Sequence, residues 1–70
     1  MEKRNCTMFT EEELSFINWS KKDMIRTFGF ENPYTIHYFK VIEQVTNSEN
    51  QRANFWKVGN AYWTIKACHN

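Results

Sequence analysis

Residues 52–66 read RANFWKVGNAYWTIK and contain the strongest structural signal in the chain. Gly59 and Asn60 divide this stretch into two runs rich in aromatic and β-branched residues, the types that favour strands. Glycine at the first position of a two-residue loop is typical of a type II′ hairpin turn. Pairing Val58 with Ala61 gives both strands a regular alternation between two faces. The stretch therefore predicts a β-hairpin.

The two faces of this hairpin are expected to differ in burial. Phe55 and Tyr62 lie on the outward face, where they form either a contact patch or a surface that Met8 and Phe9 cover. Trp19 is expected in the core, because large aromatic side chains of small domains are mostly buried. The inward face adds five residues to that core, namely Trp56, Val58, Ala61, Trp63 and Ile65.

Two short helices are expected in the N-terminal half of the chain, over residues 11–18 and 21–28. Thr10 and Ser20 each stand three residues before an acidic residue, which is the pattern of an N-terminal capping box. Gly29 would end the second helix, because a positive φ angle costs glycine little.

A third helix is expected from Asn32-Pro33 to about residue 45, because asparagine caps helices and proline suits the first helical position. Ile36, Phe39 and Ile42 fall on one stripe at helical spacing and are expected to be buried. At 100° per residue, the opposite face carries His37, Lys40 and Gln44, with Tyr34 on its border.

Three helices followed by an aromatic hairpin resemble a winged helix-turn-helix domain over residues 10–67. The expected fold class is therefore α+β, with residues 1–9 as an N-terminal arm and 68–70 as a C-terminal tail. YTIHYF (34–39) and GNAYW (59–63) are similar to the recognition helix and the Tyr-Trp hairpin of the small winged-helix regulators of bacterial fimbrial phase variation. The resemblance implies a transcriptional regulator, encoded by a bacterium, a phage or another mobile element, that binds double-stranded DNA.

The winged-helix resemblance implies two sets of DNA contacts. The helix over 33–45 would enter the major groove, where basic and amide side chains can contact base edges, with Tyr34, His37, Lys40 and Gln44. The hairpin would bind phosphates through Arg52, Lys57 and Lys66. The chain holds 9 basic and 8 acidic residues, so sequence-specific binding would need a homodimer or a DNA-bound protein partner.

A protein-binding module is the alternative from another functional class. It could act as an inhibitor of a host complex, as some phage proteins do, with Tyr34, Phe55 and Tyr62 as anchors, because aromatic residues dominate protein-binding hot spots. The net charge of +1 favours this alternative, whereas the helix followed by a wing favours DNA.

Several other classes find no support in the sequence. It contains no glycine-rich phosphate loop and no G-x-S-x-G motif, so neither an enzyme nor a small-molecule substrate is expected. Cys6, His37, Cys68 and His69 lack the spacing of a metal site, and no cofactor is expected. Cys6 and Cys68 could be bridged if the chain ends meet, although cytosolic thiols are more often free. With no stretch that approaches the roughly 18 apolar residues of a membrane span, a cytoplasmic protein is expected.

Overall fold

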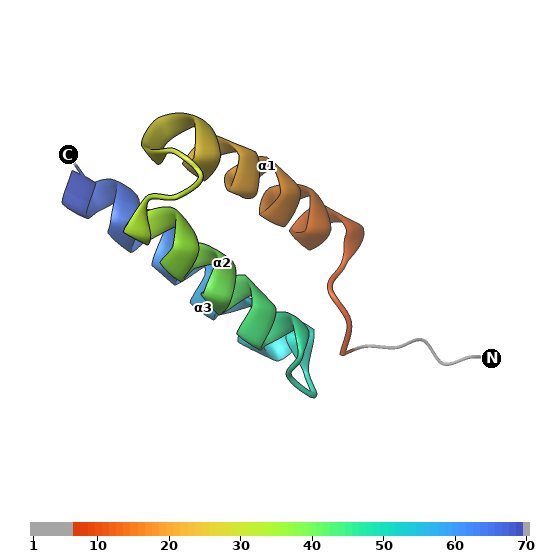
Figure 1. The fold of residues 1–70 in the computed structure, drawn as a ribbon. Helices are drawn as coiled ribbons and strands as arrows, with labels where there is room; N and C mark the ends of the chain where they lie inside the picture. The colour runs from red at the N-terminus through yellow and green to blue at the C-terminus, as the bar shows by residue number, and fades with distance from the viewer. Residues whose placement is uncertain (1–6, 70) are drawn as a thin grey trace.

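The computed structural model describes residues 7–69, and in this range the chain forms three α-helices and no strand (Figure 1). α1 spans Glu11–Phe28, α2 spans Pro33–Thr46 and α3 spans Gln51–His69. α2 and α3 lie side by side and antiparallel, and α1 packs along this pair (Figure 1). The molecule is an elongated bundle of 45 × 19 × 16 Å.

The expected α+β winged helix-turn-helix fold is wrong, because residues 52–66 belong to α3 and form no hairpin. Gly59 lies inside this helix rather than in a turn. Asn50 caps its start, since the Asn50 side-chain oxygen accepts a hydrogen bond of 2.9 Å from the Ala53 N–H. The wing that the resemblance to fimbrial regulators implied is therefore absent from the described part of the chain.

Burial explains why this stretch is helical. Within the stretch that was expected to form two strands, apolar residues also repeat at helical spacing, in steps of three and four residues. In the helix, the side chains of this stripe pack into or against the core, and this burial stabilises the helix. A two-stranded hairpin on its own is only marginally stable in water. The stripe consists of Phe55, Val58, Tyr62 and Ile65, of which the last three are buried.

α1 is one continuous helix and not the two expected short ones. Its start is confirmed, because Thr10 and Glu13 form a reciprocal capping box with two hydrogen bonds of 3.0 Å. Ser20 does not cap a second helix. Its hydroxyl donates to the Ile17 carbonyl at 3.0 Å and forms a 2.6 Å hydrogen bond with the Tyr38 hydroxyl, so it lies buried within α1.

Gly29 ends α1 as predicted, with a φ angle of +99° that favours glycine. The predicted start of α2 is also confirmed, because the Asn32 side chain accepts a 2.8 Å hydrogen bond from the Tyr34 N–H and Pro33 is the first helical residue. Both signals depend on neighbouring residues only, which is why the sequence reveals them.

The expected buried stripe of α2 is confirmed for Ile42, which lies in the core, and in part for Phe39, which packs against it, but it is wrong for Ile36. Ile36 is 48% exposed, whereas the buried side chains are Thr35, Tyr38, Ile42 and Val45. Thr35 and Tyr38 can be buried because their hydroxyls are hydrogen-bonded. Thr35 donates to the Gly29 carbonyl at 2.8 Å, and Tyr38 bonds to Ser20 of α1.

The tryptophans expected in the core are on the surface. Trp19 is 52% exposed, Trp56 is 62% exposed and Trp63 is 61% exposed. In a helix, Trp56 and Trp63 share a face that is turned away from the buried stripe of α3. Of the other residues expected in the core, Val58 and Ile65 are buried there and Ala61 packs against it. The full set of core residues is Ile17, Met24, Tyr38, Ile42, Val45, Val58, Tyr62 and Ile65.

The segment before α1 packs on the start of α3. The Phe9 N–H donates to the Gln51 side-chain oxygen at 2.9 Å, and the Phe9 ring meets the Phe55 ring edge-on at 6.0 Å between centroids. Of the two alternatives for Phe55, cover by the N-terminal segment is therefore confirmed for Phe9, while Met8 remains exposed. Cys6 lies outside the described residues, and Cys68 is exposed near the end of α3. Within residues 7–69, no helix is both long enough and apolar enough to cross a membrane.

Candidate functional site

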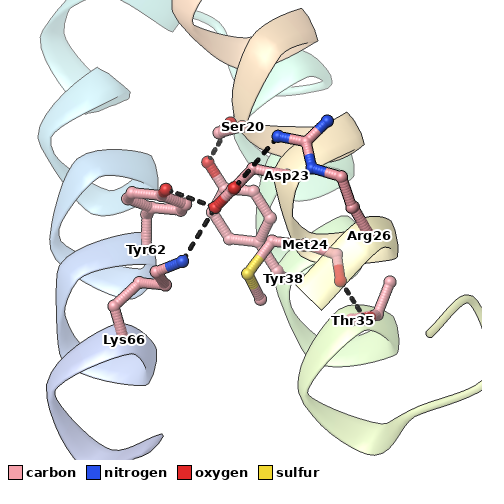
Figure 2. A network of polar contacts seen from close by, with 8 residues as sticks. All are labelled: Ser20, Asp23, Met24, Arg26, Thr35, Tyr38, Tyr62 and Lys66. Atoms are coloured by element: carbon pink, nitrogen blue, oxygen red, sulfur yellow. Dashed lines mark hydrogen bonds and ion pairs between the residues drawn. The ribbon is translucent and has the colours of Figure 1, made fainter. Parts of the chain in front are cut away.

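A polar network joins α1 to α3 and is centred on Asp23 (Figure 2). The Asp23 carboxylate accepts hydrogen bonds from the Tyr62 hydroxyl at 2.6 Å and from the Lys66 ammonium at 2.9 Å. Arg26 adds a weaker contact of 3.4 Å from its exposed side chain. These groups converge on one carboxylate from two helices, so the network fixes how α1 and α3 pack.

The ionisation states of this network favour a structural role. Hydrogen bonds from Tyr62 and Lys66 hold the pKa of Asp23 below its ordinary value. Burial and the bonded Asp23 carboxylate raise the pKa of Tyr62, and burial raises the pKa of Tyr38 to about 12. At neutral pH the carboxylate is charged and both phenols are protonated, so none of them is poised to exchange protons there.

The residues expected to contact DNA bases all lie on α2. Tyr34, His37, Lys40 and Gln44 are exposed, and the last three share one face of the helix as predicted. The residues expected to bind phosphates lie on α3 and not on a wing. Arg52 and Lys66 are 14 positions apart, about 21 Å along a helix, and Lys66 is engaged by Asp23. Lys57 is exposed beside the Trp56 ring.

Two of the three residues expected to anchor a protein partner are not available on the surface. Tyr62 is 1% exposed and Phe55 is partly buried, so the outward placement of both is wrong. Tyr34 is exposed on α2. The large apolar side chains that are available between α1 and α3 are instead Trp19 and Trp63.

A groove between α1 and α3, called here the α1–α3 groove, has an aromatic lining and an acidic rim. Its volume is about 360 Å³. Gly59 leaves it open on the α3 side, because a Cβ atom at this position would meet no atom within 4 Å. The lining residues from the described part of the chain are Glu12, Glu13, Phe16, Phe55, Gly59 and Trp63.

Aromatic contacts hold the walls of the α1–α3 groove in place. Phe16 of α1 meets Phe55 and Tyr62 of α3 edge-on, with ring centroids 5.9 and 5.6 Å apart. Trp63 stands edge-on to Tyr62 at 4.8 Å while most of its surface stays in solvent. Edge-to-face pairs of this kind are each worth about 0.5–1.5 kcal/mol, so the groove is largely preformed.

The sequence contains a signal for this groove that the hairpin interpretation hides. Phe55, Gly59 and Trp63 are spaced by four residues, which places them on one side of a helix. In a hairpin, Gly59 would lie in the turn, and Phe55 and Trp63 would lie on two different strands. The α1–α3 groove is visible only once residues 51–69 are read as helical.

Comparison of the chain with protein-family models, with curated proteins and with solved structures finds no match. The resemblance to regulators of fimbrial phase variation therefore stays a prediction. The case for function comes from the surface of the molecule.

Proposed function

We propose that this protein is a small protein-binding module whose contact surface is the α1–α3 groove together with the exposed tryptophans of α3. One observation carries the proposal: Trp63 is 61% exposed beside a groove walled by Phe16 and Phe55. Tryptophan is among the residues most enriched in protein-binding hot spots, which cluster in well-packed pockets. A cytoplasmic location is part of the same proposal.

The arrangement of α3 supports an extended contact. Trp56 and Trp63 are seven residues apart, two helical turns, so both rings lie along one exposed face. Trp19 adds a third exposed ring from α1, where it contacts Phe16 and Tyr62. Grouped exposed rings of this size are typical of interaction surfaces rather than of a solvated face.

The test compares two variants of the full chain as baits in a lysate of the cells that produce it. Trp63→Ala removes the ring at the groove, whereas Ile36→Ala removes a similarly exposed apolar side chain from α2. We expect the wild type and Ile36→Ala to retain the same partner, and Trp63→Ala to bind it at least about ten-fold more weakly. Equal loss in both variants would contradict the proposal. Circular dichroism of each variant checks that the helices are intact.

DNA binding through α2, without a wing, is the second candidate. It is favoured by the exposure of His37, Lys40 and Gln44 on one face of a helix, where such side chains could reach base edges. The engagement of Lys66 by Asp23 counts against it, because one expected phosphate contact is lost. The low net charge also counts against it.

A nuclear magnetic resonance titration separates this candidate from the first. The labelled chain is mixed with a duplex of about 20 base pairs at roughly 50 and 200 mM salt. DNA binding would shift amide signals of α2, more weakly at the higher salt, and Lys40→Ala with Gln44→Ala would remove the shifts. Protein binding through the α1–α3 groove predicts no salt-dependent shifts on α2.

A further inference from the structure

We propose that the α1–α3 groove binds an arginine side chain of a partner polypeptide. This inference rests on the proposed protein-binding function and adds the chemistry of the bound group. It follows from three features of the groove: its rings, its carboxylates and the absence of any basic residue among the described residues that line it.

No cation from the described residues lies over the rings of the α1–α3 groove, and Trp63 is the most exposed of them. Elsewhere on the surface, lysines already lie over aromatic rings: Lys21 over Phe39 at 5.4 Å, Lys57 over Trp56 at 5.8 Å and Lys66 over Tyr62 at 5.7 Å. Within residues 7–68, no lysine or arginine occupies this position over the three lining rings, Phe16, Phe55 and Trp63. The electron-rich faces of such rings attract cations.

The rim supplies the complementary charge. Glu12 is exposed, and no described residue forms an ion pair with it. One Glu13 oxygen accepts the Thr10 N–H in the capping box, and the other remains for a ligand. The charged side chains that line the groove are thus both negative in a chain whose net charge is +1. This local charge complements a positively charged partner.

Arginine suits this combination better than lysine. Its guanidinium group is planar and weakly hydrated, so it can stack on the exposed Trp63 ring and still donate two hydrogen bonds to one carboxylate. A lysine ammonium is strongly hydrated and would lose more of its solvation against the apolar walls. The absence of a side chain at Gly59 leaves room for the flat group to approach α3.

The test is a titration of the isotope-labelled full chain with two peptides of the same shape. The first is acetyl-Gly-Arg-Gly-amide, and the second replaces arginine by citrulline, which is uncharged. We expect the arginine peptide to shift the Gly59 amide and the Trp63 indole N–H with a dissociation constant of roughly 1–10 mM, which requires ring stacking and hydrogen bonds to a carboxylate together. Equal binding of the citrulline peptide, or shifts on α2 instead, would overturn the proposal.

Matched variants test the two components of the site. Glu12→Gln should weaken binding of the arginine peptide about two- to five-fold, the range for one exposed ion pair. Glu11→Gln, in the same first turn of α1 but outside the lining, should leave it unchanged. Gly59→Leu should fill the groove and remove the shifts, with the helical circular dichroism signal retained. Equal weakening by both glutamine variants would indicate unspecific charge attraction and overturn the site.

These results separate the inference from the function on which it rests. If Trp63→Ala abolishes partner capture but the arginine peptide shifts nothing, the protein-binding function stands and the arginine site is wrong. If the arginine peptide binds as expected but Trp63→Ala leaves partner capture unchanged, the cation site stands and the proposed protein-binding function is wrong.

Discussion

The Tyr62 hydroxyl donates a 2.6 Å hydrogen bond to the Asp23 carboxylate across 39 positions of sequence. Tyr62 is buried among rings of α1 and α2, and Asp23 also binds Lys66. Tyr62 therefore links the aromatic core to the polar network that joins α1 and α3. The pair explains both how the α1–α3 groove keeps its shape and why Tyr62 is not available to a partner.

Tyr62→Phe is expected to lower the free energy of unfolding by about 2 kcal/mol, because a hydrogen bond to a charged group is lost while the ring packing remains. Urea denaturation measures the change. Tyr34→Phe is the matched control, since Tyr34 is exposed, and it should leave the midpoint unchanged. Equal effects of the two variants would show that the Tyr62–Asp23 bond adds no stability.

Stability is expected to fall in acid through Asp23. The pKa of Asp23 is lowered in the folded protein by the hydrogen bonds from Tyr62 and Lys66. Its contribution is therefore complete above the ordinary pKa of 3.8 and is lost as the pH falls through the lower folded value. Urea midpoints at about pH 5 and about pH 2 should differ more for the wild type than for Asp23→Asn, which has no charge to lose.

The tyrosines are expected to ionise at different pH values in an alkaline titration. Burial raises the pKa of Tyr38 from 10.0 to about 12, and the pKa of Tyr62 is raised as well. Ultraviolet absorbance should therefore show late ionisation of both phenols, and Tyr38→Phe should remove part of this late change. Because the folded pKa values are raised, the stability from these groups is present below pH 10.0 and is lost as the pH rises beyond it. Ionisation of every tyrosine in one step at the ordinary value would contradict their burial.

Several local signals in the sequence predict helix ends correctly, whereas the capping pattern at Ser20 does not, because Ser20 lies buried inside α1. Thr10 with Glu13, Gly29, and Asn32-Pro33 each act through neighbouring residues, so each appears in the structure as expected. The buried stripe of α2 could not be predicted in the same way. Thr35 is buried in place of Ile36 because the backbone after α1 returns to accept its hydrogen bond, an arrangement that the α2 sequence does not show.

The error over residues 52–66 has the same origin. Strand-favouring residues and a Gly-Asn pair describe the local preference, but the burial of Val58, Tyr62 and Ile65 against two other helices determines the outcome. What could be predicted of the candidate site depends on the fold in the same way. The exposed face of α2 was predicted from the spacing of its residues. The α1–α3 groove could not be predicted, because it exists only when Gly59 and Trp63 lie in a helix.

Substitutions of the two glycines test directly whether residues 51–69 form a helix rather than a hairpin. Gly59→Ala is expected to stabilise the protein by about 0.5–1 kcal/mol, because alanine favours a helix interior and its methyl group would meet no atom within 4 Å. Gly29→Ala is expected to destabilise it by at least about 1 kcal/mol, because the backbone there has a φ angle of +99°. Thermal or urea unfolding of both variants measures the change in the free energy of unfolding, which should have opposite signs in the two. A type II′ turn at Gly59 would need a positive φ there, so a destabilised Gly59→Ala would favour the hairpin and contradict a helical α3.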